Sequence, residues 1–429
     1  MSKKNDDFFK EKKPWSEVKD QLLGCYFKPY VQKILHTRKP LEYVDCFAGK
    51  GKFDDGNPGS PLIALDLINE CLAATKMVHP QIHTTFIDLN YADDLRANLQ
   101  GYRGVNIISG KYEDHILGLL QNSYNRNVFL YIDPYGIKAL RCSMFDSFAA
   151  SPFNSIELLI NLNSFGFIRE ACNAMGIQFQ LNDPTLFDDL VEYDPTKLTA
   201  TDKSIQDLND IAGGDYWQAI ICDYKVGRID GYEAEERFAT QYCKRLAESY
   251  AYVLNMPLRI RRGQRPKYRM VHATNHPDGC LLMVDNICNR WEAWQDVQSG
   301  GQISLFQEDV NNQSVEERDI RQKVAEYYSH LTGWTSLNAS MAQFFMKYGP
   351  ICKTKDVKDA LRDLEGSGRI QVLRAPAYTG TGRPSKFMEE KTNKQKPANK
   401  KSSPKLKKLR LEEGCTNPSG ECSIHRKKM

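Results

Sequence analysis

Two short segments constrain the fold of this 429-residue chain more than any other feature. Residues 43–51 read Tyr-Val-Asp-Cys-Phe-Ala-Gly-Lys-Gly, and residues 129–136 read Phe-Leu-Tyr-Ile-Asp-Pro-Tyr-Gly. Each is a run of apolar, strand-prone residues that ends in an acid and then in a tight turn. This pattern is typical of buried parallel strands that end beside a ligand.

Further strand-like runs recur along the chain, with helical segments between them. The region 164–248 mixes helical stretches with polar turns, and we expect it to be an α-rich insertion that covers a substrate. The sequence therefore predicts an α/β fold, a doubly wound Rossmann-like sheet within residues 1–299. The additional strands are expected at 84–88, 105–110, 155–163, 250–254 and 267–274.

The turn after the first strand predicts a nucleotide-like cofactor. Ala48, Gly49 and Gly51 are small enough to let backbone N–H groups approach a ligand. Asp45 ends the strand, where a carboxylate repels a pyrophosphate but accepts hydrogen bonds from an amino group. A cationic ligand such as S-adenosylmethionine therefore fits better than NAD, with Phe47 beside it. Short glycine turns without a cofactor are also common in α/β folds.

Two residues further along could contact the same cofactor. Asp88 ends the second strand, 43 residues after Asp45, where an acid can accept hydrogen bonds from both ribose hydroxyls. The alternative for Asp88 is a surface carboxylate that caps a helix. Tyr112 follows the third strand, in a loop that flanks the adenine ring in methyltransferase-like folds.

The turn formed by Asp133, Pro134 and Tyr135 is the candidate catalytic site. A carboxylate at a strand end can accept from an amino group, a backbone carbonyl can accept a second hydrogen bond, and an aromatic ring can stack on a flat base. That arrangement would direct an amine lone pair toward an electrophilic methyl group. An ordinary Asp-Pro turn is the alternative.

A set of motifs spread over about residues 8–295 resembles the bacterial three-Cys-motif partner proteins. The resemblance implies a class I methyltransferase-like core and a partner protein with three clustered cysteines. One departure concerns the reaction: amino methyltransferases of nucleic acids usually carry an acid or Asn, two prolines and an aromatic residue, whereas Tyr135 here follows a single proline. The matching motifs are Phe8-Phe9, Trp15-Ser-x-x-Lys19, Leu22-Leu23, Tyr26, Tyr43-Val-Asp45, Phe47-Ala-Gly49, Gly59-Ser-Pro-Leu62, Ile132-Asp-Pro134-Tyr-Gly136 and His272-Ala-Thr-Asn-His-Pro277.

The character of the sequence changes near residue 300. Residues 300–314 read as a polar linker, and residues 315–390 predict three helices followed by a hairpin with a glycine-rich tip. This order is typical of a winged helix-turn-helix domain, which binds duplex DNA or, alternatively, docks on proteins. Its candidate nucleic-acid contacts are Lys355, Lys358, Arg362 and Arg383.

Positive charge is concentrated in two places. Residues 391–429 hold 12 Lys or Arg against 3 Asp or Glu, a net charge of +9, and we expect this tail to be disordered. The rest of the chain carries −5, so the basicity is a property of the tail. A second basic run, between the last two strands of the sheet, adds Arg261, Arg262 and Arg265 as candidate phosphate contacts. Solvated surface is the alternative for both.

Two functions follow from the sequence. The first is an S-adenosylmethionine-dependent methyltransferase acting on DNA or RNA. The second is a non-catalytic nucleic-acid-binding subunit that works with a three-cysteine-motif protein. The absence of a long apolar run or a leader predicts a cytoplasmic protein without membrane association, and no cysteine or histidine spacing indicates a metal site.

Overall fold

The computed structural model describes residues 6–75, 81–180, 202–258, 268–297, 317–374 and 423–426. The chain divides into two compact units. The larger comprises Met1–Ser314 and Phe345–Lys353, and the smaller comprises Val315–Phe344 and Thr354–Met429. The predicted linker at 300–314 lies outside the described residues.

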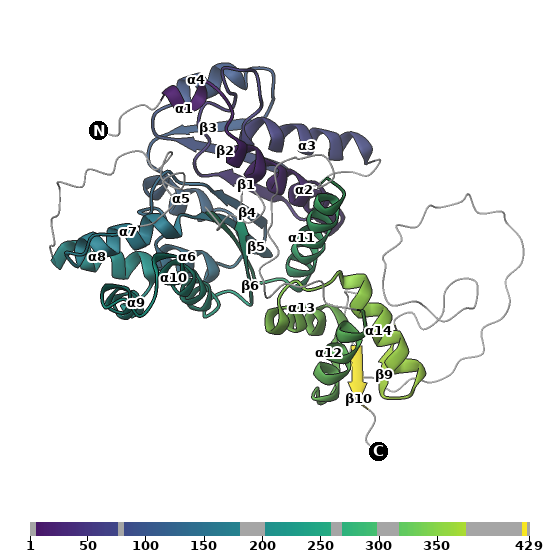
Figure 1. Ribbon diagram of the computed structural model, residues 1–429. Coiled ribbons are helices and arrows are strands. Elements are labelled where there is room, and N and C mark those ends of the chain that lie inside the picture. Colours follow the sequence, from purple (N-terminus) through teal and green to yellow (C-terminus); the bar gives the residue numbers. More distant parts are fainter. Residues whose placement is uncertain are drawn as a thin grey trace, which may run out of the picture. The chain divides into compact units, whose positions relative to one another are not determined.

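A seven-stranded sheet, counted over the described residues, forms the centre of the larger unit (Figure 1). The strand order is β3-β2-β1-β4-β5-β7-β6, and β7 runs antiparallel to both of its neighbours. Every strand that the sequence predicts for this sheet is present. A doubly wound order with one reversed strand near the edge is that of a Rossmann-like α/β sheet. The strands are β1 (Leu41–Asp45), β2 (Ile82–Asp88), β3 (Val105–Ser109), β4 (Asn127–Ile132), β5 (Ser155–Leu162), β6 (Tyr252–Leu258) and β7 (Tyr268–Thr274).

Helices cover both faces of this sheet (Figure 1). No helix in the described ranges is long and apolar enough to cross a membrane. The helices of the larger unit are α1 (Asp6–Phe9), α2 (Pro14–Thr37), α3 (Ser60–Ala74), α4 (Ala92–Asn98), α5 (Tyr112–Leu120), α6 (Cys142–Ala149), α7 (Ser164–Ala174), α8 (Asp202–Ala212), α9 (Tyr216–Lys225), α10 (Gly231–Leu246) and α11 (Pro277–Val297).

Successive side chains along each strand point to opposite faces of the sheet, so the two faces have different partners. On one face, Tyr43 of β1 and Phe129 of β4 pack against Phe27 of α2, with ring centroids 4.7 and 5.2 Å from it. On the other face, Val44 and Leu130 enter a large apolar core that α5, α6, α7, α9 and α10 complete. The predicted α-rich insertion is thus present, and its described helices belong to this core.

A buried polar cluster joins α2 to the sheet. The Tyr26 hydroxyl of α2 donates to the Glu157 carboxylate of β5, and His272 Nε2 of β7 lies 3.1 Å from both partners. All three side chains are buried. Because buried polar groups are costly without partners, this cluster fixes the position of α2 on β5 and β7.

The C-terminal part contains α12 (Glu317–Ser329), β8 (Thr335–Ser336), α13 (Leu337–Tyr348), α14 (Thr354–Gly366) and β9 (Ile370–Leu373). The three predicted helices are present. The second strand and tip of the predicted hairpin lie outside the described residues, so the winged helix stays a prediction. β9 pairs with β10 (Ser423–Arg426), which lies in the tail that the sequence predicts to be disordered; this prediction is wrong for these four residues, because they satisfy one edge of β9 as an added strand.

Candidate functional site

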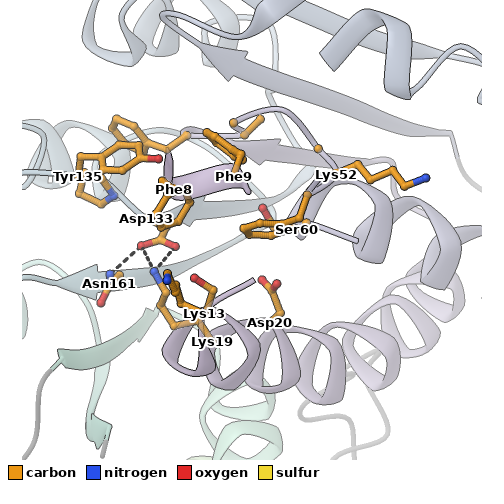
Figure 2. Close-up of a pocket in the computed structure, with 18 of the residues that line it drawn as sticks. Phe8, Phe9, Lys13, Lys19, Asp20, Lys52, Ser60, Asp133, Tyr135 and Asn161 are labelled. Carbon is orange, nitrogen blue, oxygen red and sulfur yellow. Dashed lines mark hydrogen bonds and ion pairs between the residues drawn. The ribbon is translucent and has the colours of Figure 1, made fainter. Parts of the chain in front are cut away.

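A cavity of about 330 Å³ opens where β1 and β4 end, the point at which the strand order reverses (Figure 2). Ligands of doubly wound folds bind at this switch point. Its walls come from the glycine turn after β1, the Asp-Pro turn after β4, the end of β5, and the N-terminal segment that holds α1 and the start of α2. Its lining includes Phe8, Ser16, Lys19, Ser60, Asp133 and Asn161.

The glycine turn has a backbone conformation that a residue with a side chain would adopt only under strain. Gly49 and Gly51 have φ angles of +61° and +76°. A Cβ atom on Gly49 would lie 2.9 Å from the Phe9 ring, and one on Gly51 would lie 2.7 Å from a Leu95 methyl group. The structure therefore has room for glycine but not for a larger residue at these two positions. Both glycines line the cavity together with Phe47 and Ala48.

Asp45 lies behind this turn and does not itself line the cavity. Its carboxylate is fully buried and accepts hydrogen bonds from Ser60 Oγ at 2.6 Å and from the Phe47 N–H at 3.2 Å. Burial raises the pKa of Asp45 to about 7. Ser60 does line the cavity. A ligand amino group would therefore reach the charge of Asp45 through the Ser60 hydroxyl, a residue that the sequence analysis did not select.

Asp88 also lies outside the cavity lining, and its carboxylate organises the neighbouring backbone. It accepts hydrogen bonds from the N–H groups of Gly49, Asn90 and Tyr91 at 2.9, 2.8 and 2.7 Å. The first of these bonds ties β2 to the glycine turn. The ribose contact stays a prediction for Asp88, and the geometry gives this residue a second role as a support of the turn.

Tyr112 lies away from the cavity, contrary to its expected place beside a cofactor. As the first residue of α5 it turns toward the sheet, where it is 1% exposed and belongs to the apolar core. Its ring packs against Phe47 at 5.4 Å between centroids. Tyr112 thus supports a residue of the cavity wall from behind.

The three predicted catalytic residues, Asp133, Pro134 and Tyr135, all line the cavity. Lys19 Nζ lies 2.8 and 2.6 Å from the two oxygens of Asp133, and Asn161 Nδ2 donates to Oδ1 at 2.6 Å (Figure 2). The Tyr135 ring is 60% exposed and meets Phe8 edge to face at 5.5 Å. Sequence reasoning missed both partners of Asp133, although Lys19 stands within one of the motifs quoted above.

Residues of the N-terminal segment form one wall of the cavity, whereas residues 181–201 of the insertion that is expected to cover the substrate lie outside the described residues. Phe8 and Phe9 pack with Phe53 and Tyr91 over the glycine turn. Lys12 forms an ion pair with Asp20 at 2.7 Å, where burial raises the pKa of Asp20 to about 6. The described part of the insertion packs on one face of the sheet instead, because its apolar side chains complete the core there.

Two buried polar atoms of the cavity wall have no hydrogen-bond partner among the described residues. They are Ser16 Oγ and Asn161 Oδ1. The orientation of Asn161 follows from Asp133, because a carboxylate accepts and must face the amide N–H₂. Buried polar atoms normally have partners, so these two are suited to a bound polar molecule. Both atoms can accept a hydrogen bond, so they fit a ligand that donates N–H or O–H groups.

The predicted nucleic-acid contacts are only partly described. Arg261, Arg262, Arg265 and Arg383 lie outside the described residues. On α14, Lys355 and Arg362 are exposed and Lys358 is half-buried, and Arg362 forms an ion pair with Asp359.

Comparison with known proteins gives little that is specific. No family model matches the chain, and no curated protein matches it. Among solved structures, the selenomethionine-substituted CurJ carbon methyltransferase aligns with a TM-score of 0.26 and 10% identity, covering 55% of this chain and 48% of that one. The chain thus spans about half the length of that structure. PKMT2 from Rickettsia typhi aligns with a TM-score of 0.26 and 11% identity over 80% of this chain and 72% of that one. The fold assignment rests on the order and direction of the strands in the sheet.

Proposed function

We propose that this chain is an S-adenosylmethionine-dependent methyltransferase that acts on nucleic acid, at a base amino group. One observation carries the proposal: the glycine turn after β1 and the Asp133 carboxylate after β4 face the same cavity. At about 330 Å³, this cavity has the size of a small-molecule site. It also lies at the switch point of the sheet.

Residues of the glycine turn would hold the cofactor. The backbone at Gly49 and Gly51 leaves room for close approach, and Ser60 connects the cavity to the buried charge of Asp45. When bound, the cofactor supplies an electrophilic methyl group on a sulfonium. The ionised form of Asp45 becomes more favourable beside a cation, which offsets part of the cost of its burial.

The opposite end of the cavity would hold the acceptor. Asp133 can accept a hydrogen bond from an amino group, and this orients the nitrogen lone pair without removing a proton from it. The exposed ring of Tyr135, braced by Phe8, offers a face on which a flat base can stack. The single proline of the turn gives Tyr135 a different place from the aromatic residue of typical amino methyltransferases, so the base would stack in a different orientation.

The charge distribution supports a polyanionic substrate. The C-terminal tail carries a net charge of +9, which would raise the rate of encounter with DNA or RNA without sequence preference. Exposed Lys355 on α14 adds a candidate phosphate contact. We further propose, from the resemblance of the motifs, that a three-cysteine-motif protein is a partner.

The cofactor claim is tested by titration calorimetry with S-adenosylmethionine. We expect binding by the wild type and by Asp93→Asn, a surface control in an exposed ion pair, and weaker binding by Asp45→Asn. A folded wild-type protein that binds no cofactor would contradict the proposal. Methyl transfer is then measured with a radiolabelled cofactor on DNA and on RNA. Asp133→Asn should lose transfer under cofactor concentrations at which it still binds S-adenosylmethionine, and equal transfer by this variant would exclude the catalytic assignment.

A further inference from the structure

The acceptor end of the cavity already contains a positive charge. Lys19 Nζ contacts both oxygens of Asp133, and Asn161 Nδ2 adds a second donor to Oδ1. Two carboxylate oxygens offer about four lone-pair positions in all. Three of them are taken, so Oδ2 retains a single position for a further donor.

The surroundings hold Lys19 in this place. Its side chain is 10% exposed, and its ammonium lies 5.6 Å from the centre of the Tyr268 ring, in a cation–π contact. It projects from α2, which the buried Tyr26 hydroxyl anchors on the sheet. Lys19 is therefore a built part of the site, and its charge cancels that of Asp133.

We propose that Lys19 makes this end of the cavity selective for a neutral acceptor over a protonated amine. The inference rests on the proposed function and narrows its substrate class. The amino group of a nucleobase is uncharged at neutral pH and can give one N–H to Asp133 Oδ2. A lysine-like ammonium needs an uncompensated carboxylate, and here it would meet the Lys19 ammonium instead. Lys19 is thus a specificity-determining residue and does not take part in bond making.

The test compares two cofactor analogues that differ at the reacting end. S-adenosylhomocysteine has a neutral thioether there, and sinefungin carries a primary ammonium in place of the methylated sulfur. The ratio of their dissociation constants cancels contacts that both molecules share. Lys19→Met leaves Asp133 uncompensated, so we expect the ratio to shift toward sinefungin by about tenfold or more.

Three further variants define the origin of such a shift. Lys52→Met removes a charge from the same cavity wall, at a side chain that points away from Asp133 in Figure 2, and should leave the ratio unchanged. The double variant Lys19→Met/Asp133→Asn removes both charges and should restore the wild-type ratio. Asp133→Asn alone leaves Lys19 uncompensated and should shift the ratio away from sinefungin, which keeps the test decisive if Lys19→Met does not fold.

The outcomes separate this inference from the proposed function. The ratio of the two dissociation constants could be the same in wild type, Asp133→Asn and folded Lys19→Met. That result would overturn the proposed selectivity of Lys19 and leave the cofactor site intact. An equal shift in Lys52→Met would also overturn it, because the effect would then be one of net charge. A folded wild-type protein that binds neither analogue would overturn the proposed function itself, and the inference with it.

Discussion

The buried carboxylate of Asp45 makes the stability of the larger unit depend on pH, and Asp45→Asn isolates that contribution. Asparagine keeps the two local hydrogen bonds: its carbonyl oxygen can accept from the Phe47 N–H, and its amide can donate to Ser60 Oγ. The variant removes only the charge and its titration.

The magnitude follows from the pKa of Asp45, which burial raises from 3.8 to about 7. Between these values the folded state keeps a proton that the unfolded chain has released, so stability is fully present below pH 4 and is lost as pH rises to 7. Each pH unit in this window costs about 1.4 kcal/mol, which gives about 4 kcal/mol as an upper limit. Asp45→Asn should therefore gain stability relative to wild type by up to about 4 kcal/mol between pH 4 and pH 8.

Urea denaturation at several pH values measures this difference, with tryptophan fluorescence as the signal, to which buried Trp217 of the larger unit contributes. Asp93→Asn is the control, because Asp93 is almost fully exposed and its replacement should leave the profile parallel to wild type. Parallel profiles for Asp45→Asn and wild type would refute the reasoning, since the carboxylate would then titrate alike in both states.

Three other predictions concern affinity and packing. S-adenosylmethionine should bind more tightly as pH rises from 6 to 8, by at most about tenfold per unit below pH 7, because a cation favours ionised Asp45; a flat calorimetric profile would speak against this. Gly51→Ala should lower the free energy of unfolding in urea by about 2–4 kcal/mol, because φ is positive and the new methyl group would lie 2.7 Å from a leucine methyl group. Gly56→Ala, where φ is also positive but the space is open, should cost about 1 kcal/mol, and equal costs would exclude the clash. Glu235→Gln should destabilise by about 3–5 kcal/mol in urea denaturation, because Arg269 would remain as an unpaired buried charge, and adding Arg269→Met should recover most of the loss; a double variant no more stable than Glu235→Gln would contradict this.

The sequence predicts the sheet and its turns well, because both are encoded locally. Apolar runs that end in an acid mark β1 and β4, and the carboxyl ends of parallel strands meet at one edge of the sheet. That rule is enough to bring the glycine turn at Gly49 and the Asp133 turn together. The small residues of the first turn are equally explicit, since positive φ angles favour glycine.

What the sequence does not predict depends on contacts between distant segments. Lys19 and Asp133 are separated by 114 positions, and their ion pair follows from the path of α2 over the sheet. The same holds for Asp88. The sequence shows an acid at the end of a strand, but the N–H groups that donate hydrogen bonds to its oxygens depend on the geometry of the turns around it. The position of Tyr112 after β3 predicts a cofactor contact, whereas the direction of the first turn of α5 buries its ring in the core.

The anchoring of α2 has a consequence for how the acceptor site keeps its dimensions. Tyr26 and Lys19 are seven residues apart, so they lie on the same side of the helix, about 10 Å from each other along its axis. The buried cluster of Tyr26, Glu157 and His272 holds α2 in place on the sheet. The length of helix between Tyr26 and Lys19 therefore sets the distance from this cluster to the ammonium of Lys19. The width of the acceptor end of the cavity thus depends on contacts in the interior of the protein.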